Sequence, residues 1–164
     1  MRILGIDPGA RVTGYGLIDV ERNQTHAVKW GIFRAASTAP LAMRLKVICE
    51  GLSEFLVQHT PDVCVIESLF FARNARTALL LGHARGALLL SVARAGIPVA
   101  EYSPLEVKQA VAGYGRAEKE QVRRMVIRLL AIRGTPRPCT DAADALAVAL
   151  CHAHTMGNAR VLTK

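Results

Sequence analysis

Cysteine is scarce in this sequence, and the few cysteines present are not paired. None of the four belongs to a C-x-x-C motif: Cys49, Cys64, Cys139 and Cys151. This argues against a zinc site built on paired cysteines and against a small domain held together by disulfides. We therefore interpret all four as reduced thiols in the core or at the surface.

A long apolar run is also missing, although a membrane-spanning helix takes roughly 18 consecutive apolar residues. The richest segment, residues 78–95, is interrupted by His83, Arg85 and Arg94. The first residues, Met1–Asp7, have a strand-like pattern and do not resemble a signal peptide. We expect a soluble protein in the cytoplasm.

Acidic residues are in the minority. The chain contains 13 Asp and Glu against 21 Lys and Arg, which gives a formal net charge of +8. In a compact protein such an excess favours a polyanionic partner, most often nucleic acid. The length of 164 residues suits one domain with its own core. We expect a single domain over residues 1–164.

Hydrophobic patterning predicts a mixed α/β sheet of five strands with helices on both faces. Short turns join the first three expected strands, as in an antiparallel meander: residues 3–7, 12–20 and 25–34. Two later strands are expected at residues 63–67 and 98–102. Helical periodicity covers residues 41–59, 77–94, 104–108, 117–132 and 141–154. Glycines within residues 12–20 allow another chain or a ligand to approach closely.

The helix expected over residues 77–94 is apolar around most of its circumference. Such a helix must be buried on several sides, and we predict that part of it forms a two-fold interface between copies of the chain. Gly82 and Gly86 lie one turn apart and permit close helix packing. We interpret His83 as a packed or hydrogen-bonded residue.

Four acidic residues mark the ends of expected elements. Asp7 and Glu67 each end a strand, and Asp141 and Asp144 open the last helix. Because neighbouring strand ends in an open α/β sheet converge on one crevice, we expect these carboxylates to lie together. Helix capping is the alternative explanation for Asp141 and Asp144.

Clustered carboxylates repel one another and raise one another's pKa values. A bound divalent cation reduces this repulsion. Oxygen ligands favour Mg²⁺ or Mn²⁺, and two such ions can activate water for attack on a phosphodiester. The glycines at Gly9 and Gly14 have the spacing of a phosphate-binding loop. Tyr15 stands where such a loop requires a lysine, so we do not expect one here. We interpret His152 and His154 as helix-end or surface residues.

Three motifs in order resemble the RuvC family of bacterial Holliday-junction resolvases. They are G-I-D-P-G-x-x-x-T-G-Y-G over residues 5–16, Ile66-Glu67 followed by Phe70, and D-A-A-D-A-L-A over residues 141–147. The resemblance spans nearly the whole chain. It implies an RNase H-like fold, a homodimer, and metal-dependent paired nicking of opposed strands of a four-way DNA junction in homologous recombination and DNA repair. RuvA and RuvB, the branch-migration proteins, are implied as partners.

The resemblance also implies roles for individual residues. The family's acidic tetrad, which is catalytic and binds two Mg²⁺ or Mn²⁺ ions per active site, corresponds to Asp7, Glu67, Asp141 and Asp144. Phe70 matches an aromatic residue that stacks on a base near the crossover, with Phe71 as the alternative ring. Lys108 and Lys119 match residues that contact the DNA backbone. We expect the basic DNA-binding surface to comprise Arg73, Arg76, Lys108, Arg116, Lys119 and Arg123.

Three other functions share features with this sequence. An enzyme of the actin and sugar-kinase type also opens with a strand followed by Asp-x-Gly, but a single domain of 164 residues is too short for its two-domain cleft. A non-catalytic junction-binding module and a related short RNase H-like family implicated in RNA processing remain as alternatives.

Overall fold

The computed structural model describes residues 1–22, 24–68 and 74–162, and of residues 158–162 the backbone only. After an opening run of three strands, helices and strands alternate as far as the fifth strand, and three helices follow it. In order, the elements are β1 (Arg2–Asp7), β2 (Val12–Glu21), β3 (Gln24–Arg34), α1 (Leu41–His59), β4 (Val63–Glu67), α2 (Ala75–Arg94), β5 (Val99–Tyr102), α3 (Pro104–Ala112), α4 (Lys119–Leu129) and α5 (Thr140–Leu162). Among the described helices, none combines the length and apolar character needed to cross a membrane.

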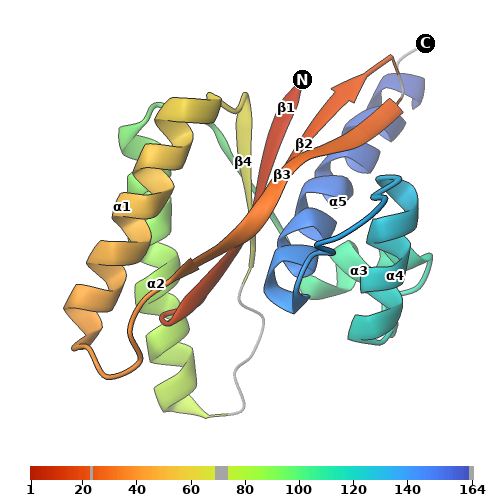
Figure 1. Cartoon of the computed structure of the whole chain (residues 1–164). Coiled ribbons are helices and arrows are strands. Elements are labelled where there is room, and N and C mark those ends of the chain that lie inside the picture. Colours follow the sequence, from red (N-terminus) through yellow and green to blue (C-terminus); the bar gives the residue numbers. More distant parts are fainter. Residues whose placement is uncertain (23, 69–73, 163–164) are drawn as a thin grey trace.

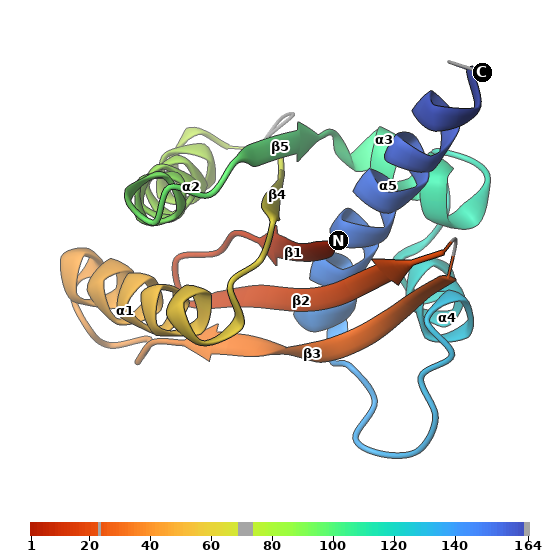
Figure 2. The same cartoon turned by 90° about the horizontal axis from the view of Figure 1, so that it is seen from above.

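The strands form one five-stranded mixed sheet in the order β3-β2-β1-β4-β5. β1, β2 and β3 pair antiparallel, whereas β4 pairs parallel with β1 and β5 parallel with β4. Helices α1 and α2 cover one face of the sheet, and α3, α4 and α5 lie on the other (Figures 1 and 2). The prediction of a mixed sheet with helices on both faces is therefore confirmed.

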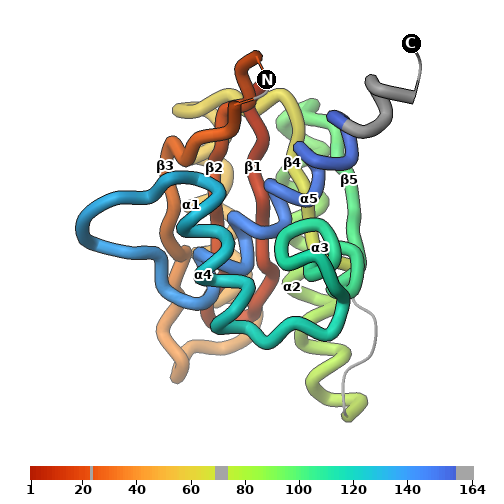
Figure 3. The backbone as a smooth tube through the Cα atoms, turned by 90° about the vertical axis from the view of Figure 1, so that its right-hand side faces the viewer, coloured from red at the N-terminus to blue at the C-terminus, as the bar shows by residue number. Residues whose placement is uncertain are grey.

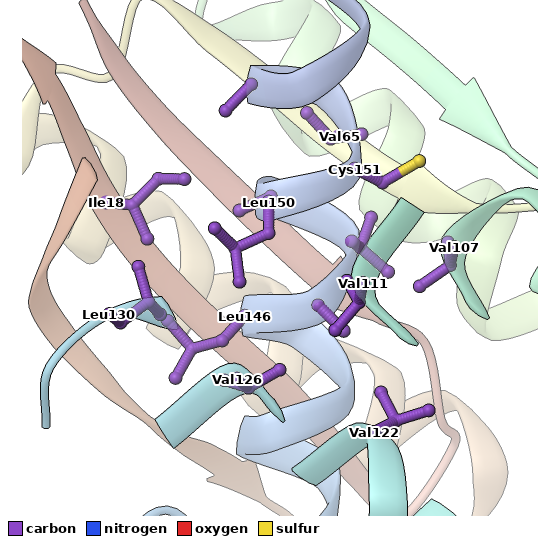
Figure 4. Packing of buried hydrophobic residues seen from close by; sticks show 14 of the residues in the cluster. Ile18, Val65, Val107, Val111, Val122, Val126, Leu130, Leu146, Leu150 and Cys151 are labelled. Atoms are coloured by element: carbon purple, nitrogen blue, oxygen red, sulfur yellow. The ribbon is translucent and has the colours of Figure 1, made fainter. Parts of the chain in front are cut away.

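Each face of the sheet has its own hydrophobic core. Leu4 and Ile6 of β1 pack toward α1 and α2, whereas Ile3 belongs to the core under α5. In that second core, Leu146 and Leu150 of α5 lie between the sheet and the shorter helices α3 and α4 (Figure 4). Because side chains alternate along a strand, the odd-numbered residues of β1 face α5.

Helix α5 lies directly on the backbone of β1 and β2, because glycines there leave room for it. A Cβ atom on Gly5 would lie 2.0 Å from the carbonyl oxygen of Ala145, and one on Gly14 would lie 2.0 Å from that of Asp141. The glycines of β2 were expected to admit another chain or a ligand, and the segment that packs closely on them is α5 of the same chain. The contact at Gly14 sets the start of α5 against the sheet.

Replacing Gly14 with Ala should therefore displace the start of α5. We expect the free energy of unfolding to fall by about 1–3 kcal/mol, the usual cost of overpacking, as measured by urea denaturation. Gly157→Ala is the matched control, because Gly157 lies in the same helix and a Cβ there meets nothing within 4 Å. Equal stabilities of the two variants would contradict close packing of α5 on Gly14.

Within the described chain one side of α2 is buried, so burial of its other sides would depend on the predicted two-fold interface. Ala84, Leu88 and Val92 are buried, whereas Leu79 and Leu90 are 63% and 60% exposed. This outward apolar face also contains glycines, and a Cβ on Gly82 or Gly86 would meet nothing within 4 Å. His83 is exposed on the same helix rather than packed, because the core side of α2 is already filled by its aliphatic residues.

Several helix ends differ from those expected, for local reasons. α2 begins at Ala75 because the Asn74 side chain accepts a 2.8 Å hydrogen bond from the backbone of Thr77. α3 is longer than expected, and it ends where Gly113 adopts a left-handed conformation with φ of 85°. α5 continues through Gly157 to Leu162.

Candidate functional site

Strand geometry places Asp7 and Glu67 on the same face of the sheet. Asp7 follows Ile3 and Gly5 on the α5 side of β1, and Glu67 follows Val63 and Val65 on the α5 side of β4. The strands are parallel neighbours with Ile6 opposite Ile66, so both end at the same edge. The predicted convergence of the two strand-end acids is a direct consequence of this register.

The start of α5 brings the other two acids to that edge. Asp7 pairs with Gly14 in the sheet, and Gly14 lies under the carbonyl group of Asp141. Asp144 follows one turn later on the same helix. The structure therefore gathers all four acids that the sequence analysis singled out.

Burial and neighbouring charges perturb two of these carboxylates. The pKa of Asp7 is raised from 3.8 to about 7, first by burial and then by the charges of Asp144 and Glu67, with a smaller effect from Asp141. The pKa of Glu67 is raised by burial and by Asp144. Such mutual destabilisation of the charged forms makes the edge an attractive position for a cation.

A lysine already meets this negative charge. Nζ of Lys119, the first residue of α4, donates a 2.8 Å hydrogen bond to Oδ2 of Asp144. The hydrogen bond and the nearby carboxylates raise the pKa of Lys119. Lys108 on α3 lies near enough to lower the pKa of Glu67 against the stronger raising effects. Two predicted DNA-contacting lysines thus border the acids.

A compact turn holds the end of β1. The hydroxyl of Thr13 donates to the carbonyl of Gly9 at 2.9 Å and accepts from the Gly9 backbone N–H at 3.3 Å. Thr13 is fully buried, so these bonds satisfy its polar side chain. The Asp-Pro-Gly-x-x-x-Thr motif therefore orients the segment after Asp7 instead of forming a phosphate-binding loop.

The other predicted basic residues differ in their surroundings. Arg116 and Arg76 are exposed, the latter in the first turn of α2. Arg123 has a structural contact, because its Nε donates to the carbonyl of Pro138 at 3.1 Å and so ties α4 to the segment before α5. The predicted roles of Phe70, Phe71 and Arg73 concern residues that lie outside the described ones.

Two histidines on α5 are more buried than the sequence indicates. His152 is buried, and its Nδ1 lies 3.0 Å from the hydroxyl of Tyr102 on β5. His154 is half-buried with its Nδ1 3.0 Å from the carbonyl oxygen of Ala110 on α3. Their interpretation as helix-end or surface residues is wrong for His152, because α3 and β5 pack over this part of α5.

The donors at the acidic edge fit a divalent metal ion. They are carboxylate oxygens, the ligand type that Mg²⁺ and Mn²⁺ prefer. Burial, and after it the charge of neighbouring carboxylates, raises the pKa values of Asp7 and Glu67. Within the described residues, a tighter group of three possible ligands occurs elsewhere, at Asp19, Glu21 and His26. That group lies at the opposite end of β1, and Arg2 already pairs with Asp19 at 2.9 Å.

The sequence matches one protein family along most of its length. A family model described as "Crossover junction endodeoxyribonuclease RuvC" matches residues 3–152. The RuvC crossover junction endodeoxyribonuclease of Desulforamulus reducens is 52% identical over 153 residues, which cover 93% of each chain. The corresponding protein of Halorhodospira halophila is 56% identical over 153 residues, or 93% of this chain and 90% of the relative.

Solved structures of Holliday junction resolvases also resemble this chain. Thermus thermophilus RuvC in complex with a Holliday junction substrate superposes with a TM-score of 0.87 at 37% identity, and the match covers 96% of both chains. The yeast mitochondrial Holliday junction resolvase Ydc2 has a TM-score of 0.69 at 14% identity over 96% of this chain and 80% of that one. The latter shows a common fold alone, and the expected RNase H-like fold is confirmed.

Proposed function

Because the chain belongs to the RuvC family of crossover junction endodeoxyribonucleases, we propose that it resolves four-way DNA junctions by metal-dependent nicking of two opposed strands. The observation that supports this most strongly is the convergence of Asp7, Glu67 and the start of α5 on one edge of the sheet. We propose one nuclease domain over residues 1–164, acting in recombination and repair in the cytoplasm.

A nuclease of this family uses a divalent metal, and the acidic edge is where this chain can hold it. We propose that the ligands are Asp7, Glu67, Asp141 and Asp144, and that each site takes two Mg²⁺ or Mn²⁺ ions. When bound, such ions supply an activated water and stabilise the leaving oxygen of the phosphodiester.

The chain's own residues prepare the site for that chemistry. Burial and mutual repulsion keep Asp7 protonated up to about pH 7 while the carboxylates lack a cation. Ligation therefore requires that Asp7 release its proton. Lys119 forms an ion pair with Asp144, one of the proposed ligands. We therefore propose that Lys119 also contacts a DNA phosphate beside the cut. Lys108, Arg116 and Arg76 extend positive charge around this edge, with Arg123 and Arg73 as further proposed contacts.

We propose a homodimer whose contact is the outward face of α2. Leu79 and Leu90 are the apolar residues most exposed on this face, and the space beside Gly82 and Gly86 is open to another helix. A two-fold assembly would present two active sites to the two equivalent strands of a junction. RuvA and RuvB are proposed as partners on family grounds alone.

Phe70 follows the Glu67 end of β4 by three residues, which supports its proposed role in stacking on a base at the crossover. Unpairing a base costs a few kcal/mol, and base–aromatic stacking returns about 1–3 kcal/mol.

We predict that Phe70→Ala slows cleavage of a fully paired junction roughly tenfold or more with little loss of binding. A junction with unpaired bases at the crossover should recover part of the rate. Phe71→Ala is the matched variant, and absence of selective rescue in both would contradict stacking.

A substrate panel tests the proposed activity. The protein is incubated with a mobile four-way DNA junction, a linear duplex, a single strand and a structured RNA, with and without Mn²⁺. We expect symmetric nicks in the junction that depend on the metal, and ends that DNA ligase can seal. Equal cutting of the duplex, or preferential cutting of the RNA, would contradict junction resolution. Binding without cleavage would indicate a non-catalytic module.

A further inference from the structure

The hydrogen bond between Tyr102 and His152 joins two parts of the molecule that carry the acids. Tyr102 ends β5 and lies opposite Glu67 in the parallel pairing of β4 and β5. Its carbonyl oxygen accepts a 2.8 Å hydrogen bond from the backbone of Ser68, the residue directly after Glu67. The main chain of Tyr102 therefore holds the end of β4, where Glu67 lies.

The side chain of Tyr102 reaches the other part. Its hydroxyl lies 3.0 Å from Nδ1 of His152 on α5, with the two rings in an edge-on arrangement at a centroid distance of 5.8 Å. His152 stands eight residues after Asp144, or about 12 Å along the helix axis. Figure 2 shows the end of β5 leading into α3 beside α5. Tyr102 thus contacts both the segment that ends β4 and helix α5, which carries Asp141 and Asp144.

The polarity of this contact has a physical consequence. An apolar contact tolerates sliding, whereas a hydrogen bond prefers one length and one direction. His152 is 9% exposed, and a buried polar group needs its partner. Burial lowers the pKa of His152, so its ring is neutral at neutral pH and one ring nitrogen accepts a hydrogen bond. The pair therefore restricts how β5 can move against α5.

We propose that Tyr102 and His152 are positioning residues that hold the Glu67 end of β4 in register with the acidic end of α5. Glu67 lies at the end of the short strand β4, so a shift of β5 would move it relative to the other carboxylates. The inference rests on the proposed function, because it concerns the spacing of the proposed metal ligands. It assigns a role to two residues outside the acidic tetrad and the basic surface.

The test removes one oxygen atom. In Tyr102→Phe of the full-length protein, we expect Mn²⁺ affinity, measured without DNA by electron paramagnetic resonance of the free ion, to fall roughly tenfold or more. The single-turnover cleavage rate at saturating junction should fall about tenfold to a hundredfold, with unchanged junction affinity. Tyr15→Phe is the matched control, because Tyr15 stacks on Phe33 on the opposite face of the same sheet. It should leave both quantities unchanged.

Variants of His152 separate positioning from packing. His152→Leu should reproduce the losses of Tyr102→Phe, and the double variant should be no worse than either single one. His152→Asn should restore part of the Mn²⁺ affinity, because its amide can place a polar atom near the position of Nδ1. If His152→Leu fails to fold, Tyr102→Phe decides alone.

Mn²⁺ affinity and a cleavage rate that both stay within about twofold of wild type in Tyr102→Phe would overturn the positioning role. Losses of the same size in Tyr15→Phe would overturn it as well, because they would reflect general destabilisation. A wild-type protein that binds Mn²⁺ but leaves junctions uncut would count against the proposed function, and the Mn²⁺ affinities would still decide the role of Tyr102.

Discussion

Asp7→Asn should abolish junction cleavage and, at the same time, stabilise the metal-free protein at neutral and alkaline pH. The loss of rate should be at least about a thousandfold, as for other electrostatic elements of active sites. Junction binding should persist, because phosphate contacts supply most of the affinity. The two effects share one cause, the negative charge held at a buried position beside Glu67 and Asp144.

The pH dependence of stability follows from the raised pKa. In the folded, metal-free protein Asp7 keeps its proton up to about pH 7, whereas the unfolded chain loses it near the ordinary value of 3.8. The folded state therefore binds more protons between these values, and the free energy of unfolding should fall as pH rises through this window. The loss contributed by Asp7 is on the order of 4 kcal/mol at most. Asp7→Asn should remove most of the slope, leaving a part from Glu67, whose pKa is also raised.

Asp19→Asn is the matched control, at the other end of the same strand pair. Its hydrogen bond with Arg2 lowers the pKa of Asp19, so this carboxylate stabilises the fold above its ordinary pKa and the contribution is lost as pH falls. Asp19→Asn should therefore destabilise the protein at neutral pH and leave cleavage intact. Urea denaturation across pH, in the presence of a chelator, measures both variants. A normal cleavage rate in Asp7→Asn would remove Asp7 from the active site.

Leu90→Glu should convert dimers into monomers and end paired nicking. Leu90 is 60% exposed on α2, so the substitution should hardly change the stability of a monomer. In an apolar interface, however, an unpaired charge is unfavourable. We expect the dimer to weaken at least ~100-fold, the loss that truncation of a dominant interface residue produces. Sedimentation velocity at micromolar concentration measures the change in mass. Junctions cut by the variant should carry one nick rather than two.

Val57→Glu controls for the added charge. Val57 is 79% exposed on α1, a different helix from the one proposed to form the interface, and its replacement should leave the dimer and paired nicking unchanged. Leu88 is unsuitable for this test because it is fully buried in the chain's own core, so its replacement would unfold the protein. A wild-type protein that sediments as a monomer while cutting both strands would contradict the proposed interface.

The acidic site could be predicted from the sequence because its geometry depends on simple periodicities. Asp7 and Glu67 each end an apolar strand, and the parallel register that pairs Ile6 with Ile66 places both strand ends at the same edge of the sheet. The approach of α5 was predictable only in part. The glycines signalled that something would pack closely on β2, but the identity of that segment depends on contacts such as Gly14 with Asp141, far apart in the chain.

Which residues of α2 face outward, and which residue pairs with His152, could not be predicted, for a common reason. Periodicity shows that a side chain is apolar or polar, but it does not show which neighbour covers it. Leu79 is apolar and exposed, whereas His152 is polar and buried against Tyr102. In both cases the outcome depends on how much of each helix the sheet and the neighbouring helices cover, which is a property of the assembled layers.

A plasmid that extrudes a cruciform provides the most direct measurement of the central claim, that this chain resolves junctions by metal-dependent paired nicking. The supercoiled plasmid and an otherwise identical one without the inverted repeat are incubated with the protein and Mg²⁺, and the linear and open-circular products are separated on a gel. We predict linear DNA from the cruciform plasmid and unchanged supercoiled DNA from its control, with no reaction in the presence of a chelator. Equal cutting of the two plasmids, or cutting that persists without metal, would contradict the account.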